Sequence, residues 1–519
     1  MRSERQKMDS RPMLNLYPDS IGRDLEGFCT VLDRAEFFDT FSSVYLLPSI
    51  YHSDLDRGFS VIDYDLEEKY KTAETLEKIR KKGIYLKLDF VLNHASVQSP
   101  QFQDLLEKGR ASKYQDFFID WNKFWEGCGE MTEDGYILPE KKYLDKMFFR
   151  KPGLPLLMVE FADGSRAPYW NTFYQEIRET KDYHTRYLGQ MDLNIRSEMV
   201  WDFYRETIEK LSGYGAKIIR LDAFAYAPKT PGEKNFLNEP DTWELLEKIR
   251  ELTTSYDMAL LPEIHASYGE KRYEMIAQKG YLTYDFFLPG LIIDAIAKQD
   301  GSFLAAWATE QTERGIDSVT MLGCHDGIPV LDLKGLLPDE RIQELIELLV
   351  ERGGYVKDLH GNKSMYYQVN TTYYNALGKS AAALLLARAI QLFMPGKPQV
   401  WYLDLFAGEN DYQAVKAAGA GGHKEINRTN LSLEEVTKRL GMDVVKKQLQ
   451  MLRFRNTFPA FGFDAHLSVY SSENQMNFLW EKGGYLAKLK LDFEKCGFQM
   501  EGRRENGEEI FSMEELGEC

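Results

Sequence analysis

The stretches KIIRLDAF (residues 217–224) and MALLPEIH (residues 258–265) decide the fold. Each is a short apolar run that ends in charged residues, and longer charged segments of amphipathic character separate such runs along the chain. This alternation is typical of βα units around a parallel sheet. Six further runs continue the pattern, at residues 13–17, 43–48, 85–94, 282–287, 318–326 and 399–408. The sequence therefore predicts an α/β fold, a (β/α)8 TIM barrel.

Two interruptions and a distinct end divide the chain further. The alternation stops after His94 for about 100 residues rich in aromatic and charged side chains, which is too long for an ordinary connection and predicts an inserted domain. A second irregular stretch follows strand seven, and the runs HLSVY, NFLWEK and YLAKLKL near the end predict a small C-terminal antiparallel β domain. The expected division is barrel at 1–95, 191–326 and 375–462, insertions at 96–190 and 327–374, and the C-terminal domain at 463–519.

Composition excludes several classes of partner. The net charge of -17 over 519 residues argues against nucleic acid, because phosphate backbones are bound by clustered Lys and Arg. The most apolar stretch, 380–394, is too short to span a bilayer and is expected to be a buried helix, so no membrane partner is predicted. The first residues form a polar leader without the apolar core of a secretory signal. The cysteines, Cys29, Cys128, Cys324, Cys496 and Cys519, match neither zinc spacing nor a disulfide framework, which favours a cytoplasmic location.

Three carboxylates stand near the ends of predicted strands four, five and seven: Asp222, Glu263 and Asp326. Burying a carboxylate costs several kcal/mol unless something pairs with it. Arg220 is the expected partner of Asp222, since residues i and i+2 of a strand share a face, and its guanidinium would keep the carboxylate ionised and oriented. Two such carboxyls, one nucleophilic and one proton-donating, are the minimal equipment of retaining glycosyl transfer. The alternative is that these groups only close the barrel with salt bridges.

The runs LDFVLNH, RLDAF, PEIH and CHD resemble, in order, the four signature segments of the α-amylase clan of glycoside hydrolases (glycoside hydrolase family 13). The runs DRGFSVIDY, YQVNTTYY, GKPQVWYLDLFAGENDY and EINR resemble its sucrose phosphorylase branch. The resemblance implies that Asp222 attacks the anomeric carbon, Glu263 shuttles the proton and Asp326 stabilises the transition state. It implies a B-type domain at 96–190 and an acceptor loop within 327–374. The expected substrate-binding residues are Asp56, Phe59, His94, Phe173, Gln190, Arg220, His325, Tyr367, Gln368 and Lys424.

Phosphorolysis requires a cation near the barrel mouth. The run FFRKPGLP supplies Arg150 and Lys151, where sucrose phosphorylases carry an arginine in a similar loop, and both are predicted to bind phosphate. Lys424 stands where the family usually has an arginine facing Asp56, so this contact would be a point charge instead of a fork.

The acceptor loop also departs from the branch. Met365 and Tyr366 replace an Asp-Leu pair, and relatives that prefer fructose 6-phosphate tend to have histidine where this chain has Tyr367. The function predicted is a retaining α-glucoside phosphorylase, by default on sucrose and phosphate. Alternative donors are glucosylglycerol, glucosylglycerate and sucrose 6′-phosphate.

Two other readings stay open. One is an α-glucosidase or transglucosidase, and the other is an inactive sugar-binding protein. No cofactor is predicted, and no metal, because the eight histidines lack paired ligand spacing and Asn93, which helps bind calcium in some amylases, needs no ion here. The resemblance suggests a monomer or homodimer.

Overall fold

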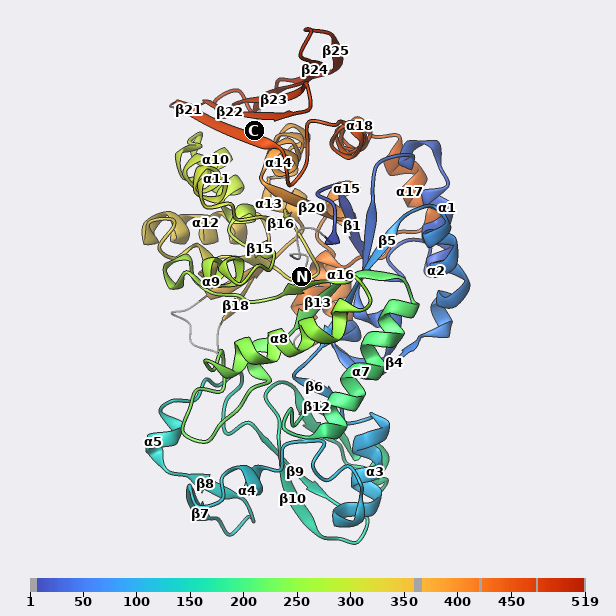
Figure 1. Cartoon of the computed structure of the whole chain (residues 1–519), viewed down its shortest axis with the longest axis vertical. Helices are drawn as coiled ribbons and strands as arrows, with labels where there is room; N and C mark the ends of the chain where they lie inside the picture. The colour runs from blue at the N-terminus through green and yellow to red at the C-terminus, as the bar shows by residue number, and fades with distance from the viewer. Residues whose placement is uncertain (1–6, 359–365, 420–421, 473–474, 518–519) are drawn as a thin grey trace. The chain divides into compact units, whose positions relative to one another are not determined.

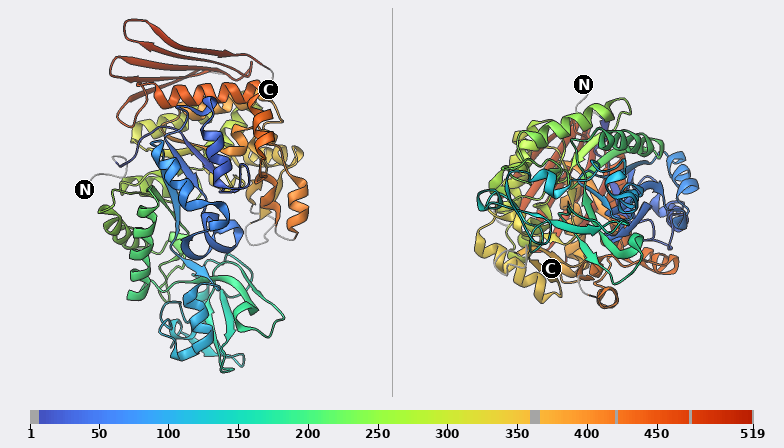
Figure 2. Two further views of the ribbon diagram at one scale, coloured as in Figure 1. Left: turned by 90° about the vertical axis from the view of Figure 1, so that its right-hand side faces the viewer. Right: turned by 90° about the horizontal axis from the view of Figure 1, so that it is seen from below.

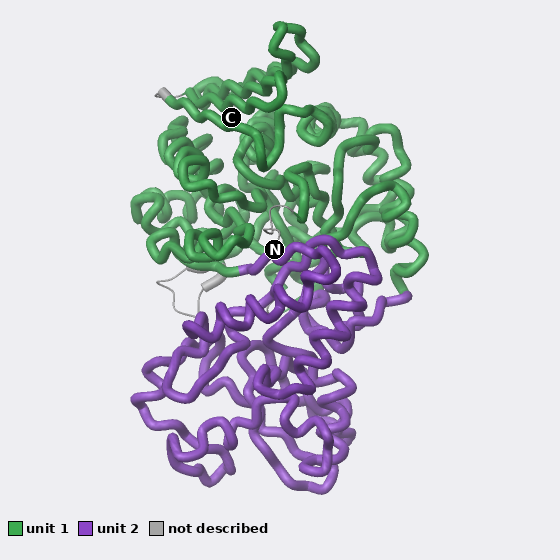
Figure 3. The backbone as a smooth tube through the Cα atoms, viewed as in Figure 1, with its two compact units in different colours: residues 1–46, 69–87, 264–519 green, residues 47–68, 88–263 purple. Residues whose placement is uncertain are grey.

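A computed structural model describes residues 7–358, 366–419, 422–472 and 475–517 (Figure 1). The chain forms two compact units, one of residues 1–46, 69–87 and 264–519 and one of residues 47–68 and 88–263 (Figure 3). The units do not follow the domain boundaries expected from the sequence, because both contain barrel strands. Those boundaries stay a prediction.

The barrel predicted from the sequence is confirmed: eight strands form a nearly closed sheet in the order β14-β13-β5-β2-β1-β20-β16-β15. Strand pairs within it are parallel, as between β1 and β2. Each of the eight apolar runs contributes one strand. The strands are β1 Met13–Leu16, β2 Ser43–Leu46, β5 Tyr85–Val91, β13 Ala216–Asp222, β14 Ala259–Pro262, β15 Thr283–Asp285, β16 Ser318–Met321 and β20 Gly396–Trp401.

Several strands end earlier than their apolar runs, and this decides how the carboxylates are held. Asp222 is the last residue of β13, whereas Glu263 follows the end of β14 directly. Asp326 lies on a loop, because β16 already ends at Met321. The sequence pattern does not show that β16 ends at Met321. The backbone N–H of Gly323 donates to the side chain of Asp404 and not to a neighbouring strand, and Asp404 lies 81 positions away in the sequence.

Helices separate the barrel strands, as amphipathic segments predicted. Helix α2 lies between β2 and β5 in the chain, and the apolar stretch 380–394 forms α14, whose residues from Ala383 to Phe393 are buried. The longer helices are α1 Leu25–Leu32, α2 Thr72–Lys81, α3 Pro100–Lys108, α7 Glu198–Gly213, α8 Asp241–Thr254, α10 Leu288–Lys298, α11 Ser302–Arg314, α12 Asp339–Glu351, α14 Ala381–Phe393, α17 Leu433–Leu440 and α18 Asp443–Thr457. The shorter ones are α4 Trp121–Phe124, α5 Lys141–Leu144, α6 Tyr183–Arg186, α9 Arg272–Gln278, α13 Tyr373–Ala376, α15 Tyr402–Leu405 and α16 Tyr412–Ala418.

The aromatic stretch after His94 folds around its own core within the second unit. Trp121, Trp125 and Trp170 are buried there, and the indole N–H of Trp121 donates to the carbonyl of Ile137 at 2.7 Å. The short strands of the second unit outside the barrel sheet are β3 Tyr51–Leu55, β4 Ser60–Leu66, β6 His94–Ser96, β7 Gly129–Met131, β8 Ile137–Pro139, β9 Leu156–Glu160, β10 Arg166–Trp170, β11 Gln175–Ile177 and β12 Tyr187–Asp192. The aromatic richness is thus used for packing.

The predicted C-terminal antiparallel domain is confirmed within the first unit as a five-stranded sheet (Figure 2). Alternate side chains of β22 are buried, and the ring of Phe511 on β25 stacks on Phe454 of α18 with centroids 4.1 Å apart. The strands are β21 His466–Ser472, β22 Gln475–Lys482, β23 Tyr485–Asp492, β24 Gly497–Arg504 and β25 Glu509–Glu515. The second insertion forms a smaller sheet of β17 Ile328–Pro329, β18 Tyr355–Asp358 and β19 Tyr366–Asn370.

One expectation about cysteines is wrong. Cys496 is disulfide-bonded, whereas the cysteine spacing predicted no disulfide. Cys29, Cys128 and Cys324 are free thiols, and Cys519 lies outside the described residues. The cytoplasmic location stays a prediction. No helix in the described part of the chain combines the length and apolar composition needed to cross a membrane.

Candidate active site

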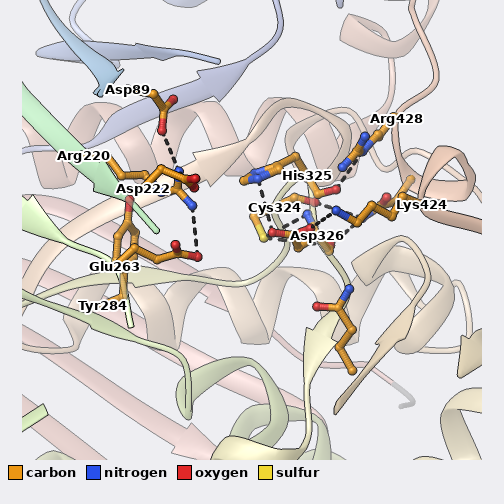
Figure 4. A network of polar contacts seen from close by, with 12 residues as sticks. Asp89, Arg220, Asp222, Glu263, Tyr284, Cys324, His325, Asp326, Lys424 and Arg428 are labelled. Carbon is orange, nitrogen blue, oxygen red and sulfur yellow. Dashed lines mark hydrogen bonds and ion pairs between the residues drawn. The ribbon is translucent and has the colours of Figure 1, made fainter. Parts of the chain in front are cut away.

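Arg220 organises the carboxylates at the end of β13 (Figure 4). Its Nη1 donates to Asp222 Oδ1 at 2.8 Å and to Asp89 Oδ1 at 2.6 Å, and its Nη2 lies 3.0 Å from Glu263 Oε1. The predicted pairing of Arg220 with Asp222 is therefore present. One buried guanidinium also holds Glu263 and Asp89, so that the two candidate reacting carboxylates are oriented by the same side chain.

Burial dominates the electrostatics of Asp222. It raises the pKa of Asp222 to about 7, although the charge of Arg220 lowers it, and the negative charges of Glu263 and Asp89 raise it further. The sequence predicted that Arg220 would keep Asp222 ionised. In the structure the charge of Arg220 is shared among three carboxylates, so Arg220 alone does not hold the pKa of Asp222 low. The two carboxyls share one guanidinium, and the negative charge of Glu263 raises the pKa of Asp222, so the charge of one carboxyl influences the protonation of the other.

The DRGF motif forms a tight turn whose backbone requires glycine. Gly58 has φ of +116°, and a Cβ there would lie 2.1 Å from the backbone nitrogen of Ser49. Asp56 itself has a positive φ of 48° in this turn. The turn places the ring of Phe59 5.4 Å from the guanidinium carbon of Arg220, so this predicted residue does border the carboxylate cluster.

His94 and Phe173 lie together in the second unit. Their ring centroids are 4.8 Å apart, and burial lowers the pKa of His94 to about 4, so its imidazole is neutral. His94 Nε2 lies 3.2 Å from the carbonyl oxygen of Phe59, and Nδ1 lies 3.4 Å from Asn93 Nδ2. The protein thus already contacts both ring nitrogens, and a glucosyl hydroxyl at His94 would have to share one of them.

The two cations predicted to bind phosphate have different surroundings. The guanidinium of Arg150 lies over the rings of Phe173 at 5.6 Å and Tyr226 at 5.9 Å. Lys151 instead donates to Asn171 Oδ1, and burial lowers its pKa to about 8. Arg150 therefore lies on the aromatic side chains next to His94, whereas Lys151 is directed to a buried amide.

In the first unit, Asp326 belongs to a separate group of contacts. Lys424 Nζ lies 3.2 Å from Asp326 Oδ1, and His325 Nε2 lies 3.3 Å from Asp326 Oδ2. The backbone N–H of Asp326 points to Cys324 Sγ at 3.4 Å. The structure thus brings the predicted residues His325, Asp326 and Lys424 together, with Lys424 on the carboxylate itself.

The remaining predicted residues are buried or lie at the edge of the described chain. Gln190 is buried on β12, and its Oε1 lies 3.5 Å from the backbone nitrogen of Tyr174. Gln368 is buried on β19 and donates to Asn370 Oδ1 at 3.3 Å. The backbone of Tyr367 lies on β19, while its side chain and Met365 fall outside the described part.

The side chain of Asn93 accepts a hydrogen bond from a buried lysine of the chain. Lys229 Nζ donates to Asn93 Oδ1 at 2.9 Å and lies 2.7 Å from Asp192 Oδ2, with both charged side chains almost completely buried. Within the described ranges, no group of three or more His, Cys, Asp or Glu residues could hold a metal ion. The oxygen atoms around Asn93 are thus satisfied by an ammonium group of the chain.

Sequence reasoning missed several residues that support the site: Asp89, Tyr226, Asp404, Asn427 and Arg428. A signal existed for Asp89, because a carboxylate inside the apolar run LDF needs a buried partner. Asn427 and Arg428 belong to the EINR run that resembles the sucrose phosphorylase branch, but that resemblance gave neither of them a role. Their contacts run to backbone carbonyls about 100 positions away, which no local pattern encodes.

Comparisons with known proteins identify the family of the chain. The α-amylase catalytic-domain family matches residues 17–322. The chain is 54% identical over 495 residues to sucrose 6(F)-phosphate phosphorylase of Ilumatobacter coccineus, covering 93% of this chain and 94% of that protein. It is 34% identical to sucrose phosphorylase of Streptococcus mutans, covering 95% and 97%. The crystal structure of sucrose 6F-phosphate phosphorylase from Thermoanaerobacter thermosaccharolyticum matches with a TM-score of 0.86 and 34% identity, over 98% of each chain. The chain is therefore a glycosyltransferase-type phosphorylase and belongs to the sucrose phosphorylase branch of the α-amylase family.

Proposed function

We propose that this protein is a retaining phosphorylase that transfers the glucosyl group of sucrose 6(F)-phosphate to inorganic phosphate. The observation that carries the proposal is the single guanidinium of Arg220 on both Asp222 and Glu263, at 2.8 and 3.0 Å. The 54% identity to a sucrose 6(F)-phosphate phosphorylase supports this donor over the unphosphorylated sucrose expected from the sequence.

The reaction runs as a double displacement. Asp222 attacks the anomeric carbon while Glu263 donates a proton to the departing glycosidic oxygen, which leaves a β-glucosyl ester on Asp222. A phosphate oxygen then attacks the same carbon, Glu263 takes up the proton and α-glucose 1-phosphate is released. Asp326 stabilises the positive charge that develops on the glucosyl ring.

Phosphate has to compete with water for the glucosyl ester. Arg150 is the cation proposed to favour it, because its guanidinium lies on Phe173 and Tyr226 in the same unit as Asp222 and Glu263. Electrostatic attraction raises the local concentration of a dianion, so this contact would favour phosphorolysis over hydrolysis.

Unphosphorylated sucrose is the second candidate donor. Two observations favour it: the 34% identity to a sucrose phosphorylase, and Tyr367 in place of the histidine typical of relatives that prefer fructose 6-phosphate. Glucosylglycerol and glucosylglycerate are the remaining candidate donors, because phosphorylases of these compounds are 31% and 30% identical to the chain.

A phosphorolysis screen separates these functions. The purified chain is incubated with each donor, with and without phosphate, and release of glucose 1-phosphate is measured against the Asp222→Asn variant as control. We expect the largest kcat/KM with sucrose 6(F)-phosphate. Larger values with sucrose would reassign the donor, and phosphate-independent release of glucose would make the protein a hydrolase.

A further inference from the structure

The loop that carries Asp326 is held by two side chains from one distant segment. Asn427 Nδ2 donates to the carbonyl of Cys324 at 2.9 Å and to that of Asp326 at 2.8 Å. Arg428 Nε donates to the carbonyl of His325 at 2.8 Å. Three consecutive carbonyls of the loop are thus bound from the EINR motif, and Figure 4 labels Arg428 of this motif beside His325.

These contacts are shielded from water. Asn427 is 2% exposed and Arg428 is 3% exposed, so a lost hydrogen bond would leave a buried carbonyl without a solvent substitute. Arg428 is itself oriented by Glu425 at 3.2 Å and by the ring of Tyr17, whose centroid lies 5.6 Å from its guanidinium carbon. Both donors are therefore buried, and Arg428 is also oriented by contacts of its own.

The opposite end of the loop is held in the same manner. Asp404, a buried residue of α15, accepts from the backbone N–H of Gly323 at 2.7 Å. A Cβ at Gly323 would lie 2.7 Å from Asp404 Oδ2, so glycine is required for this approach. Between Gly323 and Asp326, every residue thus has a backbone group bound by a side chain from elsewhere in the chain.

The same segment also reaches the carboxylate. Lys424 lies in the 3₁₀ helix Gly422–Asn427, and its Nζ is 3.2 Å from Asp326 Oδ1. Side chains of one short segment therefore contact both the backbone and the carboxylate of Asp326. Such an arrangement determines where a carboxylate lies without the support of a strand.

We infer that Asn427 and Arg428 are positioning residues for the reaction, which act by holding the backbone of Asp326 in the orientation that stabilises the transition state. This inference rests on the role proposed for Asp326. Misplacing a charge by about 1 Å can cost about 100-fold in rate. The effect should fall on kcat, since stabilisation that operates only in the transition state does not alter donor binding.

The test compares Asn427→Ala with Asn430→Ala. Asn430 lies three positions further along the same segment, is exposed, and donates through its amide to Asp19 at 3.0 Å. We expect Asn427→Ala to lower kcat about 10- to 100-fold, with the donor KM within about twofold of the parent, and Asn430→Ala to behave like the parent. Arg428→Lys, which can still donate to His325, should retain more activity than Arg428→Ala, and this pair carries the test if Asn427→Ala does not fold.

A double-mutant cycle shows whether Asn427 acts through Asp326. The Asp326→Asn and Asp326→Asn/Asn427→Ala variants are compared with an activated donor such as glucosyl fluoride, so that slow variants stay measurable. Equal rates for the two support the inference, because a misplaced backbone costs nothing once the carboxylate is gone. A full additional loss in the double variant overturns it, as does an Asn427→Ala enzyme as fast as the parent. If the Asp326→Asn variant stays active, the proposed role of Asp326 itself is wrong. If Asp326→Asn loses activity as expected but Asn427→Ala is as active as the parent, only the inference is wrong.

Discussion

Asp222 and Asp326 are held in different ways. Asp222 ends strand β13, so the regular alternation of the strand aims its side chain, and one arginine two positions earlier completes the orientation. Asp326 lies five positions beyond the end of β16, on a loop whose backbone is bound by Asp404, Asn427 and Arg428.

The difference indicates what each carboxylate is sensitive to. Around Asp222 the contacts are between charged side chains, so substitutions there should change charge and protonation. Around Asp326 most contacts are hydrogen bonds to backbone, so substitutions there should change geometry with little effect on any pH profile. The predictions below test this distinction.

The largest effect is expected from Asp222→Asn. Without the nucleophile, turnover should fall by about four orders of magnitude. The variant should also fold at least as stably at pH 8, because burial raises the pKa of Asp222 to about 7 and the neutral amide removes a buried charge. Steady-state rates and thermal melts check both points. A folded variant with near-normal turnover would remove Asp222 from the mechanism.

Glu263→Gln should show a smaller, donor-dependent loss. With a poor leaving group, loss of the general acid should cost about 100- to 10,000-fold. Glucosyl fluoride needs little protonation, so its first step should be nearly spared. Rates with both donors are measured on the same preparation. An equal loss with the two donors contradicts the acid/base role.

The cations at 150 and 151 should affect phosphate and spare an uncharged donor. Arg150→Ala should raise the KM for phosphate about 10- to 100-fold through loss of a charge-assisted contact, while transfer of glucose to the enzyme from an uncharged donor such as glucosyl fluoride is almost unchanged. Arg166→Ala, at the exposed first residue of β10, is the matched control.

Lys151 is expected to add a pH dependence. Since burial lowers its pKa to about 8, it is charged below and neutral above that pH, so the KM for phosphate should rise above pH 8. Lys151→Arg, which stays charged, should remove the rise. If the KM of the Arg150→Ala/Lys151→Ala variant is unchanged, the phosphate site lies elsewhere, such as around Gln368.

The smallest effect is a displacement of the pH profile. With Asp222 at a pKa of about 7, the kcat/KM for the donor should fall below that pH as the nucleophile becomes protonated. Asp89→Asn removes a negative charge that raises this pKa and releases Arg220 Nη1 for Asp222, so the acidic limb should move to lower pH. Asn427→Ala should leave the limb in place. If the acidic limb of the kcat/KM profile moved equally in Asp89→Asn and Asn427→Ala, the distinction between the two carboxylates would be wrong.

Much of the fold could be predicted because each barrel strand is a local apolar run. The pairing of Arg220 with Asp222 was predictable for the same reason, since their i, i+2 spacing on a strand places both on one face. The phosphate pair was less predictable. Arg150 and Lys151 are adjacent in sequence, yet one lies on Phe173 and Tyr226 and the other bonds Asn171, because the direction of each side chain depends on neighbours that the sequence does not reveal.

By itself, the sequence determined the barrel, the C-terminal sheet and the family, and it predicted the three carboxylates, because these depend on short-range periodicity and on motifs of a few residues. Only the tertiary structure decided that Arg220 is shared among three carboxylates, that Lys424 contacts Asp326, and that the EINR motif binds the loop of Asp326. These contacts join residues separated by up to about 130 positions, so they exist only after the strands have assembled.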